Sequence, residues 1–278
     1  QIESIVGILN GTTNYILSQM TETGVNYANA LADAQKQGFA EADPTNDVCG
    51  FDAARKLAIL SSIGFRANVT FDDVLVEGIE KIDKSDIQYA KDMGYTIKLL
   101  TVALRQENGI ALNVYPAFLP DNHPLSSVKG AYNAIYVTGN IVDDVMFYGR
   151  GAGALPTASA VMGDVISTAQ HILNGSTGTG MIMTDTKRIP FYSSLKLQNS
   201  YYFRLDVDDV TGVLSQIAAA FAENDISICE VVQKRKTKGL AELVLITELA
   251  SRESILQVEK ALQVLPCMRK VANVIRVM

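Results

Sequence analysis

The chain has 278 residues with 24 basic and 30 acidic side chains, which gives a net charge of −6, and 48% of its residues are hydrophobic. This length is typical of two compact domains, and so high a hydrophobic content excludes a disordered chain. No run approaches the roughly 18 apolar residues that a membrane helix needs. The acidic balance argues against nucleic acid, whose protein partners need a basic face. We therefore expect neither a membrane nor a nucleic acid as partner.

The cysteines and the first residues indicate the compartment. Cys49, Cys229 and Cys267 are widely spaced and form no CxxC motif, so we expect buried thiols in a reducing environment. The first twenty residues lack the basic region and cleavage site of a signal peptide. Together these features predict a cytoplasmic protein. Because the first residue is Gln rather than Met, we also expect a processed or excised piece of a longer chain.

The first half of the chain changes from helical to strand periodicity. From residue 14 to about residue 65, apolar side chains recur at steps of three and four, with breaks at Gly24, Gly38 and residues 44–50. This pattern predicts three helices. The chain then predicts short helices over 72–80 and 85–91, four strands of one sheet, and a helix over 155–173. The predicted strands cover residues 96–104, 110–118, 134–138 and 142–148.

The last eighty residues predict a self-contained unit with the order β-α-β-β-α-β, the ferredoxin-like arrangement. Its strands cover residues 201–207, 227–234, 241–247 and 271–277, and its helices cover 212–222 and 251–264. We interpret the basic run Lys234-Arg235-Lys236 as a solvated hairpin loop, because residues 199–278 hold ten acidic and ten basic residues. The predicted fold class is α+β, a mixed sheet with flanking helices followed by this ferredoxin-like unit.

An acidic segment precedes a predicted helix that carries two cations. Residues 41–56 include four carboxylates and end in Arg55-Lys56. The spacing of four places Asp52 and Lys56 on one helical face. An ordinary exposed pair, with acids at a helix N-terminus, is the alternative interpretation. The apolar continuation over 57–63 favours a pair at the edge of a core, where a lysine beside carboxylates can donate a proton.

Two further segments have open interpretations. Residues 7–15 form a polar loop before a helix, in which Thr12 or Thr13 is a candidate N-cap or the loop binds a ligand. Residues 149–154 match the dinucleotide-binding fingerprint G-x-G-x-x-A, but Asp185, the nearest acid we considered for the ribose, lies 36 positions beyond Gly149 rather than about 20. We therefore favour a glycine loop that contacts a ligand held elsewhere. The chain has no HExxH motif and no Cys/His cluster, so we expect no metal site.

Four segments together carry a family resemblance. Residues 7–16, 38–44, 47–56 and 149–157 closely resemble homoserine dehydrogenase, and the likeness covers residues 1–190. Residues 199–278 resemble an ACT regulatory domain, through Asp209–Leu214 and Asn224–Ile228, with residues 191–198 as a linker. The resemblance implies NAD(P)-dependent interconversion of aspartate semialdehyde and homoserine, on the route to threonine and methionine.

The resemblance also assigns roles by position. It implies that Lys56 is the proton donor and that Asp52 is its accompanying carboxylate. Those roles suit the chemistry, because reducing an aldehyde produces an alkoxide that an ammonium group stabilises and protonates. The resemblance further implies two sets of binding residues: for substrate Glu41, Asp47 and Thr12, and for the cofactor Gly38, Gly151 and Gly153.

Members of this family begin with a nucleotide-binding domain, which also supplies backbone carbonyls to a monovalent cation. The present sequence resembles only the part that follows. We therefore expect the main NAD(P) site and the cation site to be absent, and we expect this fragment to be inactive alone. The family pairs its subunits through the substrate region, so the resemblance implies a homodimer or a larger homo-oligomer.

A second function, of a different class, concerns the C-terminal unit. ACT domains resemble sensors that bind an amino acid where two copies meet, and threonine is the natural candidate effector. The resemblance places effector contacts at Gly212, Val213 and Asn224, where a glycine lets a ligand approach backbone amides at a helix N-terminus. The alternative is that Gly212 only serves a tight turn between strand and helix.

Overall fold

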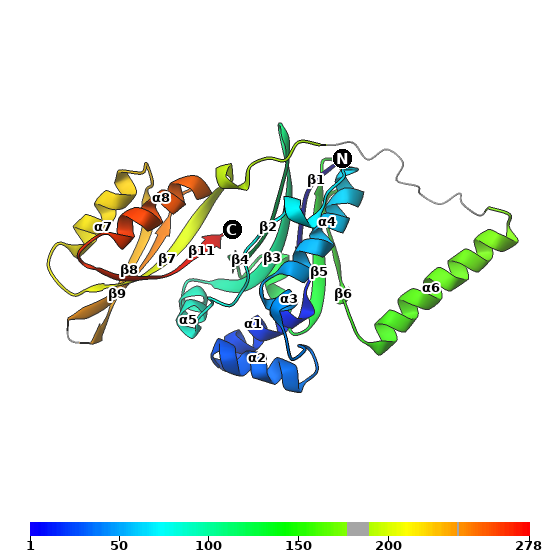
Figure 1. Ribbon diagram of the computed structural model, residues 1–278, viewed down its shortest axis with the longest axis horizontal. Helices are drawn as coiled ribbons and strands as arrows, with labels where there is room; N and C mark the ends of the chain where they lie inside the picture. The colour runs from blue at the N-terminus through cyan, green and yellow to red at the C-terminus, as the bar shows by residue number, and fades with distance from the viewer. Residues whose placement is uncertain (177–188, 238) are drawn as a thin grey trace.

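The computed structural model describes residues 1–176, 189–237 and 239–278, and one mixed sheet runs through them (Figure 1). The strand order is β6-β5-β1-β3-β4-β11-β7-β9-β8, with β2 paired to β4 and β10 paired to β7. The strands are β1 (Ile2–Ile8), β2 (Leu75–Val76), β3 (Tyr95–Gln106), β4 (Gly109–Pro120), β5 (Tyr132–Gly139), β6 (Asp143–Arg150), β7 (Gln198–Asp208), β8 (Ile228–Thr237), β9 (Leu240–Thr247), β10 (Ala250–Ser251) and β11 (Met268–Val277). The α-helices are α1 (Gly11–Thr23), α2 (Tyr27–Lys36), α3 (Thr45–Val48), α4 (Phe51–Phe65), α5 (Lys84–Asp92), α6 (Ala154–Leu173), α7 (Val213–Ala222) and α8 (Arg252–Gln263).

The N-terminal part confirms most of the predicted elements and corrects one. The three predicted early helices correspond to α1, α2 and α4, and all four predicted strands are present as β3 to β6. The helix predicted over 72–80 is wrong, because Phe71–Asp73 forms a short 3-10 turn and Leu75–Val76 joins the sheet beside β4. A capping box between Thr70 and Asp73 begins that turn, but Val74 is already extended (φ −100°, ψ 123°), so the chain leaves the helical conformation there.

Helices α1 and α4 bury apolar faces in one core beside the sheet. Ile16, Leu17 and Met20 of α1 are at most 1% exposed, as are Ala54 and Leu57 of α4. Their steps of three and four residues explain the helical periodicity seen in the sequence. This packing fixes the first turns of both helices at one place beside the sheet, and the candidate site lies there.

The C-terminal unit has the predicted order, β7-α7-β8-β9-α8-β11, with α7 and α8 on one face of its strands (Figure 1). Phe203, Ile217 and Ile255 fill the core between that face and the helices. The unit is not self-contained, contrary to the prediction. Strand β11 pairs in parallel with β4, and Tyr202 and Ile246 on the opposite face belong to the core of the N-terminal part.

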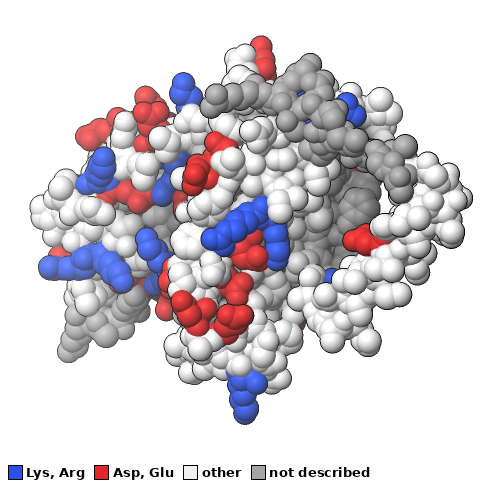
Figure 2. Space-filling model, turned by 45° about the vertical axis from the view of Figure 1, so that its right-hand side comes forward, with Lys and Arg blue, Asp and Glu red and all other residues white. Residues whose placement is uncertain are grey.

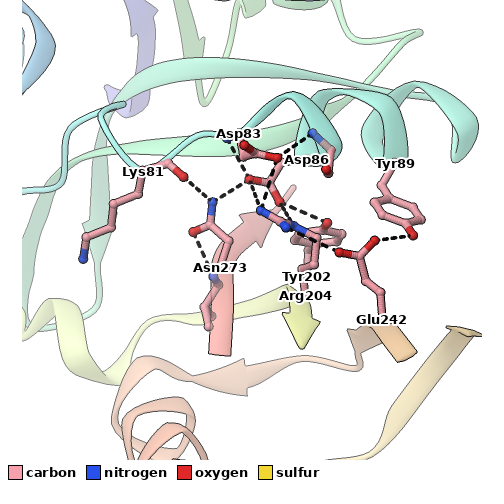
Figure 3. A network of polar contacts seen from close by, with 10 residues as sticks. Lys81, Asp83, Asp86, Tyr89, Tyr202, Arg204, Glu242 and Asn273 are labelled. Atoms are coloured by element: carbon pink, nitrogen blue, oxygen red, sulfur yellow. Dashed lines mark hydrogen bonds and ion pairs between the residues drawn. The ribbon is translucent and has the colours of Figure 1, made fainter. Parts of the chain in front are cut away.

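A buried polar network fastens this opposite face to α5 (Figure 3). The Asp86 carboxylate is 0% exposed and accepts hydrogen bonds from Arg204, Tyr202 and Asn273, the closest from Arg204 Nε at 2.7 Å. Arg204 also lies 3.5 Å from Glu242, which accepts a hydrogen bond from Tyr89. Burial is the largest single influence on the pKa of Arg204 and lowers it. The carboxylates around the guanidinium, above all Asp86, together outweigh burial, so the pKa is raised above its usual value. Because every partner is desolvated, the network depends on all of its members.

The structure corrects three further predictions, which concern the linker, the basic run and the cysteines. Residues 191–198 are no free linker, because Phe191 forms a parallel bridge with Ile110 of β4. The basic run lies on the edge strand β8 rather than in a loop, with Lys234 Nζ 3.8 Å from Asp92. Of the three cysteines expected to be buried, only Cys267 is; Cys229 is exposed and Cys49 is partly exposed.

Helix α6 stands apart from the rest of the chain (Figure 1). It is twenty residues long and rich in apolar side chains, yet none of its residues is buried. Leu155 and Leu173 at its ends are 83% and 85% exposed. No helix in the described ranges is both long and apolar enough to cross a membrane.

Candidate active site

A polar cavity of about 670 Å³ opens beside the first turns of α1 and α4. Its other walls come from residues 37–47, from β5, and from the turn between β6 and α6. All eight residues predicted for catalysis, substrate and cofactor line this one cavity, although they come from four separate segments: Thr12, Gly38, Glu41, Asp47, Asp52, Lys56, Gly151 and Gly153. Acidic and basic side chains gather side by side near the centre of the face in Figure 2.

An apolar groove of about 400 Å³ adjoins the polar cavity. Its walls come from α4 and from the β5–β6 hairpin, and its apolar lining includes Leu9, Ile59, Leu60, Ile135, Phe147 and Tyr148. Four residues line both spaces, namely Lys56, Asn133, Arg150 and Gly151. The polar cavity and the apolar groove therefore meet at Lys56.

Lys56 and Asp52 form the ion pair that their spacing predicts. Lys56 Nζ lies 2.7 Å from Asp52 Oδ2 and donates a second hydrogen bond to the Leu9 carbonyl at 3.0 Å. Their side chains are 45% and 30% exposed, so the pair faces the open cavity. A lysine ammonium has three hydrogens, and these two bonds leave one for a ligand.

Asn10 organises the carboxylates, and sequence reasoning missed it. Its Nδ2 donates to Asp47 Oδ1 at 2.6 Å and to Asp52 Oδ2 at 2.9 Å. Its Oδ1 accepts from the Thr13 amide, so Asn10 is the N-cap of α1. The expected cap at Thr12 or Thr13 is wrong, since both follow the true cap. The signal was present, because asparagine directly before a helix is among the preferred N-caps.

Thr12 and Gly38 connect α1 to the acidic segment. Thr12 Oγ1 donates to the Phe39 carbonyl at 2.6 Å, which leaves its oxygen to accept from a ligand. Gly38 has a φ of +77°, a conformation that favours glycine. The Glu41 side chain lies exposed beside this turn. Asp43 has local partners instead, since hydrogen bonds from Thr45 lower the pKa of its carboxyl.

The wall opposite these carboxylates approaches α1 very closely. A Cβ added to Gly11 would lie 2.8 Å from the Ala131 carbonyl oxygen, and one added to Gly151 would lie 2.2 Å from Asn133 Nδ2. Both distances are shorter than 3.0 Å, and real Cβ atoms essentially never approach another atom so closely. These glycines therefore allow three separate segments to meet: a larger residue at position 11 would displace the Ala131 backbone, and one at position 151 would displace the Asn133 carboxamide.

Lys98 and Asn14 hold the loop that leads into this wall. Lys98 is 2% exposed, and its Nζ donates to Asn14 Oδ1 at 3.0 Å and to the Val128 carbonyl. Asn14 Nδ2 donates to the carbonyls of Val128, Gly130 and Tyr132. Burial lowers the pKa of Lys98 to about 8. Buried polar groups of this kind rigidify the backbone that they bridge.

The three residues predicted for an effector lie at the two ends of α7. Gly212 precedes the helix with a φ of +89°, and Val213 is 7% exposed in the C-terminal core. Asn224 follows the helix, and its Nδ2 donates to the Ala220 carbonyl. A ten-residue helix is about 15 Å long, so one small amino acid within a single chain cannot contact both ends. Across the described residues no group of three His, Cys, Asp or Glu side chains could hold a metal ion.

Comparisons with known proteins match this chain to two family models and to several relatives. The family model of homoserine dehydrogenase matches residues 1–166, and that of the ACT domain matches residues 201–267. The homoserine dehydrogenases of Corynebacterium glutamicum and Mycobacterium tuberculosis are 41% and 44% identical over alignments of 281 and 282 positions, gaps included, which cover 99% and 98% of this chain. The crystal structure of a homoserine dehydrogenase from Thiobacillus denitrificans superimposes with a TM-score of 0.92 at 35% identity and covers 100% of the chain.

The chain spans 62%, 64% and 64% of these three relatives, so each of them contains a further third that this sequence does not match. The matched part includes the polar cavity, the apolar groove and the C-terminal unit with its βαββαβ order. The chain belongs to the homoserine dehydrogenase family.

Proposed function

We propose that the polar cavity binds homoserine and aspartate semialdehyde, and that the chain supplies the catalytic part of a homoserine dehydrogenase. The observation that carries this proposal is the convergence of Lys56 with Asp47, Asp52 and Glu41 around one cavity. Asp47 and Glu41 provide negative charge for the substrate's ammonium group. The first amides of α1, at Gly11 and Thr12, have no acceptor within the helix and suit the substrate's carboxylate.

In the proposed mechanism Lys56 protonates the oxygen of the reacting carbon. Its ammonium lies between the Leu9 carbonyl and Asp52, which orient it toward the cavity. As negative charge develops on the aldehyde oxygen, this ammonium stabilises the charge and then donates a proton. In the reverse direction the neutral amine removes the proton from the alcohol. Asp52 keeps the lysine in place through the whole cycle.

The residues present fit the nicotinamide end of NAD(P). The apolar groove offers a surface for a flat ring next to Lys56, and Gly151 lines both spaces without a side chain. Gly38 and Gly153 line the polar cavity but not the groove. We therefore propose that they contact the cofactor on the side of the polar cavity, next to where the two spaces adjoin. Bound NAD(P)H supplies the two electrons and the hydrogen for the reacting carbon. We propose no monovalent cation site in this chain.

We propose that the exposed helix α6 is covered by a further domain. The helix is apolar and exposed along its whole length, and its surface at the right of Figure 2 is almost entirely white. About a third of each relative lies outside the matched part. We therefore propose that α6 packs against a nucleotide-binding domain, and that two such chains pair as a homodimer or a larger assembly.

Replacing Asp47 with asparagine tests the substrate assignment. The change removes one negative charge from the cavity but keeps the shape of the side chain. We expect the affinity for homoserine to fall about tenfold or more, since hydrogen bonds to charged groups contribute roughly 1.5–3 kcal/mol. Isothermal titration calorimetry of the 278-residue chain with homoserine measures this affinity. Asp43→Asn is the matched control, because Asp43 lines the same cavity but bonds to Thr45; equal losses in both variants would contradict the assignment.

The isolated chain should bind NADPH weakly, because in our proposal the groove holds only the nicotinamide end. A fluorescence titration at micromolar concentrations is expected to show no saturation. Saturable binding in that range would mean that this chain contains the principal cofactor site.

We propose a second function for the C-terminal unit, the binding of a regulatory amino acid such as threonine. The match of the ACT model to residues 201–267 supports it. Gly212 and Asn224 lie a helix length apart, so the proposed ligand contacts Gly212 and Val213 of one chain and Asn224 of a second. The Asp86 network joins this unit to α5 and so provides a physical connection toward the site.

Replacing Gly212 with valine should abolish the response to threonine. A Cβ at this position meets no atom within 4 Å, but the φ of +89° strains any side chain. The expected result is loss of the threonine-dependent shift in melting temperature, with homoserine affinity unchanged. If Gly212→Val leaves the threonine shift intact, the effector site lies elsewhere.

A further inference from the structure

Asn133 occupies the place where the polar cavity and the apolar groove meet. It is the second residue of β5 and lines both spaces, together with Lys56. Its Oδ1 is fully buried and has no hydrogen-bond partner in the described part of the chain. Native proteins rarely leave a buried acceptor without a donor, and such a group at a cavity indicates a missing ligand atom.

The neighbouring strands hold the Asn133 backbone in place. Asn133 pairs with Gly149 of β6, and the next residue, Ala134, pairs with Ile8 of β1. Gly151 lies so close to Nδ2 that even a methyl group would not fit between them. The loop before β5 is fixed through Asn14 and Lys98. The strand pairing therefore fixes the Asn133 backbone at the edge of the cavity, and a small rotation of the carboxamide presents its oxygen to a donor there.

Asn133 and Lys56 line the same two spaces, and this shared position points to the donor. In the proposed function the substrate's ammonium lies among the carboxylates, and its reacting carbon lies at Lys56. Of the two proposed substrates, only homoserine has a hydrogen at the reacting oxygen, on its hydroxyl group. We propose that Asn133 is a specificity-determining residue whose Oδ1 accepts the hydroxyl hydrogen of homoserine while the protonated Lys56 donates to the oxygen of the same group. When Lys56 is the neutral amine, the hydroxyl turns its hydrogen to Nζ, so the proton transfer itself still goes to the lysine. This inference rests on the proposed function and adds a residue that recognises the alcohol.

The test compares L-homoserine with L-2-aminobutyrate, which has the same carbon chain without the hydroxyl group. Binding of both to the 278-residue chain is measured by isothermal titration or ligand-observed NMR. We expect the chain to prefer homoserine about tenfold, which is the preference that one buried hydrogen bond supports. Asn133→Ala should remove most of this preference by weakening homoserine alone. Asn133→Asp, which keeps the Oδ1 acceptor, should retain it.

Asn46→Ala is the matched control, because Asn46 lines the same cavity but its Oδ1 already accepts from Arg55. It should leave the ratio of the two affinities unchanged. A full preference in Asn133→Ala, or its loss in Asn133→Asp, would overturn the acceptor role of Asn133. If the unaltered chain binds homoserine no better than 2-aminobutyrate, this inference fails while the cavity can still bind amino acids. If it binds neither, the proposed function itself fails.

Discussion

Replacing Lys56 with alanine is expected to lower kcat by about 10²–10⁴-fold, the contribution typical of one general acid or base. The reason is that the reacting oxygen would lose the ammonium that stabilises and protonates it. The measurement needs an active enzyme, made by joining this chain to the nucleotide-binding domain of the Corynebacterium glutamicum relative. The homoserine affinity should change much less than kcat, because the carboxylates that bind the ammonium remain.

Lys36→Ala provides the control for this experiment. Lys36 is an exposed lysine in the last turn of α2 and is absent from the cavity lining, so its removal tests for a general effect of lost charge. We expect a near-normal kcat for this variant. A near-normal rate in Lys56→Ala would instead eliminate the lysine as proton donor, and the convergence of charges would then need another explanation.

Replacing Asp86 with alanine is expected to lower the free energy of unfolding by about 3–5 kcal/mol, the loss typical when one partner of a buried ion pair is removed. Asp86 is 0% exposed, and its loss would leave the buried Arg204 and Asn273 without their principal partner. Because the network joins α5 to the C-terminal strands, the loss should also loosen the contact between the two parts. Urea denaturation followed by circular dichroism measures the change.

Asp92→Ala is the matched control on the same helix. Asp92 is 47% exposed and lies 3.8 Å from Lys234, and exposed pairs of this kind contribute about 0–1 kcal/mol. The two variants should therefore differ by several kcal/mol. Similar small losses in both would show that the buried network contributes little to stability.

Much of the candidate site could be predicted from sequence because its chemistry is concentrated in short segments. Asp52 and Lys56 are one helical turn apart, so their contact follows from helix geometry alone. Glu41 and Asp47 precede the same helix, and the turn around Gly151 follows a strand that was itself predicted. Local spacing thus drew attention to this charged segment, the family resemblance selected Glu41 and Asp47 within it, and their meeting in one cavity depends on packing.

The residues that sequence reasoning missed act through long-range contacts. Asn10 binds carboxylates 37 and 42 positions away, and Asn133 gains its significance only from what surrounds it. The pairing of β11 with β4 joins strands about 160 positions apart, and no local pattern encodes it. The predicted self-contained C-terminal unit was wrong for the same reason, because the alternating pattern of its strands does not show what covers their second face.

A titration of the ¹⁵N-labelled chain with homoserine, followed by NMR, tests most directly whether the polar cavity binds the substrate. Saturable shifts are expected at Gly11, Thr12, Asp47 and Asn133, with none at Gly212. Saturable shifts confined to Gly212 and its neighbours, or no saturable shifts at all, would contradict the assignment of the polar cavity as the substrate site.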